Sequence, residues 1–177
     1  MNKPQVLKLA VASTFAISAS LFAINASALT ATANLGASAN VVNNCTIAAG
    51  TALSFGAYDP VGANAEVGVQ SIGSVSVTCT LDAAATVTLS QGANPGPGST
   101  AAVPLRQLKN TASAAVLSYT LYQTNALTDI WGDTDATGVD TVGTGSAVSI
   151  DVFGEVAAGQ NQPVGNYADT VVATITF

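Results

Sequence analysis

The residues best suited to chemistry are two cysteines. Cys45 and Cys79 are the only cysteines in 177 residues, and the chain has no histidine. Two thiols without histidine do not supply the four ligands of a structural zinc site. An even pair in an exported chain instead predicts one disulfide. By the loop-entropy model, closing a loop of this length contributes about 3–4 kcal/mol to stability.

An acidic stretch from Asp133 to Gly138 begins like a calcium-binding loop. Oxygen-bearing side chains stand at alternate positions, and a glycine stands where such a loop turns sharply. The position of the bidentate glutamate is, however, occupied by Thr144. We therefore expect a solvated acidic turn and no metal site.

Catalytic groups are scarce in this chain. The usual catalytic triads need a histidine, and the ten acidic residues show no spacing that indicates a carboxylate pair. Trp131 and the tyrosines have rings that can stack on sugars, but single aromatics beside strands more often pack in the core or at its rim. We expect neither an enzyme nor a bound cofactor.

Residues 1–28 have the pattern of an export signal. Lys3 and Lys8 precede a nearly uncharged apolar run over 9–24, and the small residues 26–28 form a cleavage site. A transmembrane anchor is the alternative, but the run is short for a membrane span and no basic flank follows it. The mature chain is predicted to begin at Leu29 and to contain no transmembrane segment.

The mature chain is strongly acidic. Removing residues 1–28 leaves Arg106 and Lys109 against ten acidic residues, which is a net charge of −8. No basic face can be assembled from two cations, so nucleic-acid binding is not expected. The remaining 149 residues suit one domain with a sizeable core.

Hydrophobic periodicity predicts an all-β fold. Apolar and polar residues alternate in short runs separated by clusters of Gly, Asn, Asp and Pro, with no convincing helical segment; the runs are 74–79, 85–89, 117–122, 147–156 and 169–177. This pattern is typical of an immunoglobulin-like sandwich of about seven strands. Residues 92–98 contain too many Gly and Pro for a regular element, and we expect a mobile surface loop there.

The first stretch of the mature chain alternates most regularly. Every odd position from 29 to 41 is apolar and every even one is polar or Gly; the odd residues are Leu29, Ala31, Ala33, Leu35, Ala37, Ala39 and Val41. A strand with one apolar face needs a sheet to cover that face and to pair its backbone. The sheet can belong to its own domain or to a neighbouring molecule.

The last stretch of the chain predicts another strand, over 169–177. One face of it is apolar; that face consists of Val171, Ala173, Ile175 and Phe177. We expect no later segment to cover the far edge of this strand. A bare apolar edge is a template for aggregation unless another strand covers it, so we expect these four residues to form the wall of an acceptor groove.

Several short motifs resemble the spore coat U domain family, and within it the major subunits of archaic, Csu-type chaperone–usher pili. The similar stretches are, in order, residues 45–47 and 53–56, 73–79, 106–110 with 117–122 and 131–133, and 152–154 with 165–177. Together they cover nearly the whole mature chain. The resemblance implies an incomplete Ig-like domain over 40–177, in which a donor strand from another subunit completes the sandwich.

The resemblance also implies partners and a route. A periplasmic chaperone would lend a strand during folding, and at an outer-membrane usher the next pilin subunit would replace it with its own donor strand, residues 29–39. The donor face, mostly alanine, is Leu29, Ala31, Ala33, Leu35, Ala37 and Ala39. How many residues insert stays open. The expected product is a cell-surface pilus that supports adhesion and biofilm formation.

A monomeric product is the alternative function. A self-complemented surface or coat protein would fold residues 29–39 into its own groove, and a ligand-binding adhesin would recognise a receptor. The first has little linker before Cys45, and the second normally needs a further domain that 149 residues cannot hold.

Overall fold

The computed structural model describes residues 27–177. The predicted export signal, residues 1–28, therefore lies outside the described residues except for its last two. The chain divides into two units, one ending at Ala39 and the other running from Asn40 to Phe177. Among the described residues, none of the helical structure is long and apolar enough to cross a membrane.

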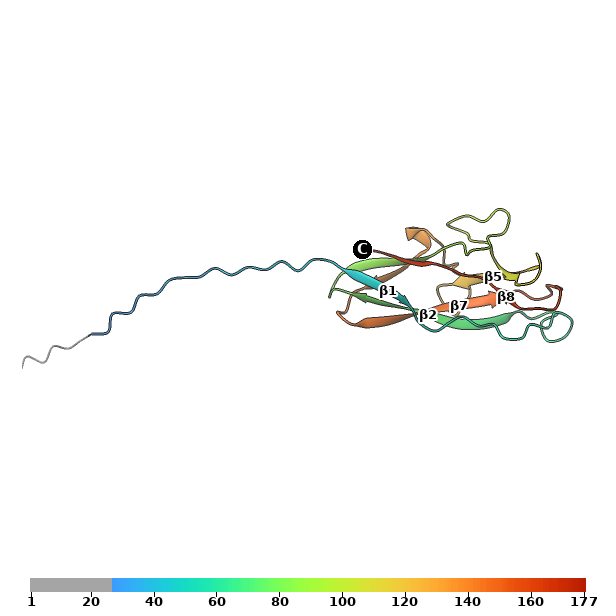
Figure 1. Cartoon of the computed structure of the whole chain (residues 1–177), viewed down its shortest axis with the longest axis horizontal. Coiled ribbons are helices and arrows are strands. Elements are labelled where there is room, and N and C mark those ends of the chain that lie inside the picture. The colour runs from blue at the N-terminus through green and yellow to red at the C-terminus, as the bar shows by residue number, and fades with distance from the viewer. Residues whose placement is uncertain (1–26) are drawn as a thin grey trace, which may run out of the picture. The chain divides into compact units, whose positions relative to one another are not determined.

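The predicted donor segment, residues 29–39, has no helix or strand (Figure 1). All of its residues are exposed, and the exposed fractions of Leu29 and Leu35 reach 98% and 95%. Two large apolar side chains thus stand in water in the single chain. That the segment forms a strand in a neighbouring molecule stays a prediction.

The second unit is built from strands, which confirms the predicted all-β fold. The described residues form nine of them: β1 (Cys45–Ala49), β2 (Val69–Cys79), β3 (Ala84–Leu89), β4 (Arg106–Asn110), β5 (Val116–Tyr122), β6 (Val139–Val142), β7 (Ala147–Val156), β8 (Tyr167–Ala168) and β9 (Ala173–Thr176). A short 3-10 helix, η1 (Asp135–Thr137), precedes β6. The count exceeds the expected seven, and two of the strands, β6 and β8, are four and two residues long.

The strands form two antiparallel sheets of unequal size. The larger has the order β1-β2-β7-β5-β4-β8, and the smaller has the order β6-β3-β9. Six strands facing three leave the smaller sheet too narrow to cover its partner. The sandwich is therefore incomplete.

Alternation along the strands builds the core. In β2, Val75, Val77 and Cys79 are buried while the residues between them are half-exposed. Across the sandwich, Val87 and Leu89 of β3 share one apolar cluster with Val75 and Val77. Trp131 is fully buried in the same cluster, and its indole N–H donates to the carbonyl of Val87 at 2.8 Å. The tryptophan is thus a core residue, as its place beside strands indicated.

The predicted disulfide between Cys45 and Cys79 is present. The two residues are directly paired in the ladder of β1 and β2, and both are buried. They lie in a small cluster with Ala83 and Ala85, against which Ile175 also packs. The bridge fastens the first residue of an edge strand to its only partner among the described strands.

Candidate functional site

Two free sheet edges lie next to each other in the second unit. Among the described strands, β1 pairs only with β2, and β9 pairs only with β3. Ile175 of β9 packs against the cluster that contains Cys45 of β1. In Figure 1, the C-terminus accordingly lies beside the start of β1. The outward N–H and C=O groups of both edges have no partner strand, although such groups normally pair.

An open groove of about 460 Å³ separates the two edges. Its floor and walls are mostly apolar; they include Ile47, Leu53, Phe55, Val75, Leu89, Leu108, Tyr119, Leu121, Val152, Val171 and Ala173. Several of these are also members of the main core cluster. The floor of the groove is therefore the hydrophobic core itself, open to solvent where a sandwich would place another strand.

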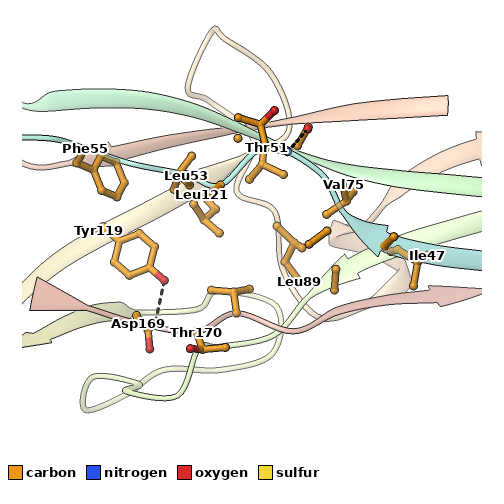
Figure 2. Close-up of a pocket in the computed structure, with 18 of the residues that line it drawn as sticks. Ile47, Thr51, Leu53, Phe55, Val75, Leu89, Tyr119, Leu121, Asp169 and Thr170 are labelled. Atoms are coloured by element: carbon orange, nitrogen blue, oxygen red, sulfur yellow. Dashed lines mark hydrogen bonds between the residues drawn. The ribbon is translucent and has the colours of Figure 1, made fainter. Parts of the chain in front are cut away.

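The first wall continues beyond β1 along residues 51–55. The Thr51 amide donates to the Ser74 hydroxyl at 2.8 Å, and the Ser74 amide donates to the Thr51 carbonyl at 2.9 Å. Further along, the Ser54 amide donates to the Ser71 hydroxyl, which donates to the Ser54 carbonyl at 2.6 Å. The segment therefore follows β2 although it is not a regular strand. Its alternation directs Leu53 and Phe55 into the groove (Figure 2).

Gly73 allows this wall to lie close to β2. A Cβ added at this position would lie 3.0 Å from the Thr51 carbonyl oxygen and 3.1 Å from the Leu53 nitrogen. Both contacts are with backbone atoms, which cannot rotate away. A side chain at residue 73 would push the wall off the sheet.

The second wall is formed by residues 169–173. Of the four residues predicted for the acceptor edge, Val171 and Ala173 line the groove. Ile175 lies further along, at the disulfide cluster, and Phe177 follows β9 with 53% of its surface exposed. The opposite wall of Ile47, Leu53 and Phe55 was absent from the sequence-based site, although the alternation of residues 52–55 pointed to it.

The two edges run in opposite directions. At one end, Cys45 lies near Ile175. At the other, the Phe55 ring packs edge-on against Tyr119 with centroids 5.9 Å apart, and the Tyr119 hydroxyl donates to Asp169 at 2.8 Å (Figure 2). As residue numbers rise along the first wall they fall along the second. A strand lying between them must be antiparallel to one edge and parallel to the other.

Among the described residues, Asp169 is the only charged one that lines the groove. One carboxylate oxygen accepts the Tyr119 hydroxyl, and the other accepts three donors, the amides of Ala93 and Asn94 and the Asn94 side chain, at 3.0–3.2 Å. Burial raises the pKa of Tyr119 above its usual value, and the hydrogen bond to Asp169 raises it further. The hydroxyl therefore stays protonated and keeps donating at physiological pH.

Arg106 closes the structure behind the groove. It is fully buried, and its guanidinium donates to the carbonyls of Leu89, Ser90 and Trp131 at 2.7–2.9 Å, while Nη1 has no partner. Desolvation lowers its pKa from 12.5 to about 10, against the opposing charges of Asp169 and Asp133. The guanidinium therefore stays charged near neutral pH. Its hydrogen bonds connect β4 to the end of β3 and to Trp131.

The predicted acidic turn is a short helical turn. The Asp133 carboxylate accepts the Thr88 hydroxyl at 3.2 Å, and Thr134 caps η1. Within residues 27–177, no three His, Cys, Asp or Glu side chains gather in a manner that could hold a metal ion.

The chain matches a known family over most of its length. The model of the Spore Coat Protein U domain matches residues 31–174. Protein U of Myxococcus xanthus is 51% identical over 177 residues, which cover 97% of this chain and 98% of that protein.

The fold is similar to that of a solved structure. The match is with a chain in the crystal structure of the CsuC–CsuE chaperone–tip adhesion subunit pre-assembly complex from archaic chaperone-usher Csu pili of Acinetobacter baumannii. The TM-score is 0.53 at 23% identity, over 77% of this chain and 40% of that one. The likeness concerns the fold, and the matched region is less than half of the chain in that structure. On the strength of the family match and of Protein U, this chain belongs to the Spore Coat Protein U domain family.

Proposed function

We propose that the chain is a structural subunit of a surface pilus, assembled by strand exchange between copies. The observation that carries this proposal is the open groove, in which core residues lie exposed between the two free edges of β1 and β9. An extended segment with one apolar face would pair with both edges and cover the core. Residues 29–39 have this pattern and are themselves unpaired.

The direction of insertion favours a neighbour as donor. In either direction the inserted strand is antiparallel to one edge, β1 or β9, and parallel to the other. We propose the direction antiparallel to β9, which only a neighbouring copy can supply. A donor antiparallel to β9 runs parallel to β1, with Ala39 at the Phe55 end. The ten steps from Cys45 to Phe55 span about 33 Å at about 3.3 Å each, whereas the six steps from Ala39 to Cys45 reach at most about 22 Å. The tail of the same copy is too short to insert in this direction.

A self-complemented monomer would need the opposite direction. The chain would have to turn at residues 40–44 and run back antiparallel to β1 and parallel to β9. The family that the chain matches is named for a spore coat protein, Protein U. A monomeric coat protein is therefore the second function to test. The direction of the inserted strand separates the two.

The export route is part of the proposal. A subunit with an open core exposes apolar surface, and such surface aggregates unless another strand covers it. The solved relative in fold comes from a chaperone–subunit complex. We therefore propose a periplasmic chaperone as the first partner and an outer-membrane usher as the second, with the pilus supporting adhesion and biofilm formation.

Deleting residues 29–39 tests the polymer. The full chain should migrate as a ladder of high-molecular-weight species in unheated detergent gels, because strand exchange links successive copies. The deletion variant keeps the groove and should be recovered with its chaperone but form no ladder. Full chain that reaches the surface only as a monomer would contradict the proposal and favour the coat-protein function.

A further inference from the structure

A second pocket of about 760 Å³ adjoins the far end of the groove. The two cavities share Leu53, Phe55, Leu108 and Asp169. Most of the remaining lining of the second comes from two loops, residues 56–60 and 162–166, and from Tyr167 and Ala168 of β8. Figure 1 shows β8 toward the end of the domain opposite the C-terminus. We call this cavity the far-end pocket.

Hydrogen bonds hold the walls of the far-end pocket in place. The Tyr58 hydroxyl donates to the Ala157 carbonyl at 2.7 Å and accepts the Gln160 amide at 2.9 Å. The Tyr167 hydroxyl donates to the Pro163 carbonyl at 2.6 Å. Val164, at the rim, is fully exposed. The pocket is thus a formed site with an apolar side chain at its entrance.

Val41 continues the apolar face of the donor segment. It occupies the next odd position after Ala39, and 82% of its surface is exposed. From the next residue the chain is attached to its own domain. The Thr80 hydroxyl donates to the Val42 carbonyl at 3.3 Å, and the Thr80 amide donates to the Asn44 carbonyl at 2.9 Å. Only Asn40 and Val41 therefore lie between the donor face and this attachment.

The short connection limits where Val41 can lie in an assembled pair. Two residues reach at most about 7 Å. A donor antiparallel to β9 places Ala39 at the Phe55 and Asp169 end of the groove. That end is the entrance of the far-end pocket, which the same two residues line.

We propose that the far-end pocket binds Val41 of the neighbouring copy of this chain. The proposal rests on the proposed polymer and extends it, since the inserted segment then reaches residue 41 and not residue 39. The odd register directs the Val41 side chain toward the acceptor, as it does for Leu35. The pocket thereby sets the last position of the donor and brings the two domains into contact.

Photocrosslinking tests where residue 41 lies. A benzophenone amino acid at position 41 of the full chain is illuminated in assembled material, and the covalent dimers are digested and mapped by mass spectrometry. We expect links to peptides that contain residues 56–60 or 162–168. Links mainly to residues 45–49 or 79–85, or an intact ladder without covalent dimers, would overturn the inference. Wild-type chain that forms no ladder would instead contradict the proposed polymer.

A pair of serine substitutions gives a second measurement. Val41→Ser should raise the dissociated fraction of polymer in warmed detergent by about tenfold or more, because an apolar side chain leaves a pocket. Val42→Ser alters the adjacent valine, which belongs to the donor's own domain, and should dissociate like the wild type. Equal behaviour of the two variants would show that residue 41 has no site in the neighbour.

Discussion

The two long sides of this sandwich differ in how the core is covered. On the side of Arg106 and Trp131, both side chains are fully buried and donate to backbone carbonyls of the facing segments. On the side of β1 and β9, the same core reaches the surface as a groove with two unpaired edges. The closed side shows that the chain can complete a core through its own side chains. The open side therefore reflects one missing strand and not a generally loose fold.

The largest effect is expected from a charge placed on the strand proposed to fill the open side. Leu35→Asp should lower the equilibrium constant for assembly by about a thousandfold or more, because an unpaired carboxylate would enter an apolar groove. Asn34→Asp adds the same charge on the face directed to solvent and should assemble normally. Detergent-resistant ladders measure both. Equal assembly would show that the register of the donor is wrong.

Next in size is the disulfide, which lies at one end of the open side. Replacing both Cys45 and Cys79 by Ser should lower the free energy of unfolding by about 3–4 kcal/mol by the loop-entropy model. Urea unfolding of the double variant and of the wild type, both as monomers, measures the loss. A loss below about 1 kcal/mol would mean that β1 is held to β2 by its ladder alone.

The closed side can be weakened without changing its charge. Arg106→Lys replaces the guanidinium, which donates to three carbonyls, with a single ammonium. Because buried carbonyls are then left unpaired, we expect the free energy of unfolding to fall by about 2–3 kcal/mol. Lys109 on the same strand is exposed, so Lys109→Arg serves as the control. If the two variants unfold at the same urea concentration, Arg106 does not hold the closed side.

The smallest effect is expected at the junction of the two sides. Tyr119→Phe removes the bond to Asp169 but leaves that carboxylate its three other donors, so the expected loss is about 1 kcal/mol. Ser118→Ala gives the background, because within residues 27–177 only the backbone of Ser118 forms hydrogen bonds. If the urea midpoint of Tyr119→Phe shifts no more than that of Ser118→Ala, the Tyr119 hydroxyl does not stabilise the groove.

Local pattern made some of this architecture predictable. Alternation is strong along β2, β5 and β7, where one face is buried and the other is not. An even pair of cysteines, in a chain predicted to be exported, indicated the disulfide. The alternation of residues 169–177 also singled out Val171 and Ala173, which line the groove, although only Ala173 lies within β9.

Other parts depend on contacts that no local pattern encodes. Residues 51–55 pair with β2 partly through serine hydroxyls, so the alternation of residues 52–55 does not by itself show which strand they follow. Arg106 is buried because three distant carbonyls converge on it. The loop over 92–98 is irregular, as expected, but Asp169 accepts from Ala93 and Asn94 of this loop across 75 or more residues of sequence. Such pairings arise only when the chain has folded.

The place of the disulfide has a mechanical consequence for a fibre. Tension on a proposed donor strand would pass through residues 42–44 into Cys45, the first residue of β1. A five-residue edge strand pulled from its end would peel from its neighbour one hydrogen bond at a time. The covalent bond at the first pair transfers the load directly to Cys79 of β2, an eleven-residue strand inside the larger sheet. The subunit would then be loaded along β2, and extension under force would have to come from the connections between subunits before any domain unravels.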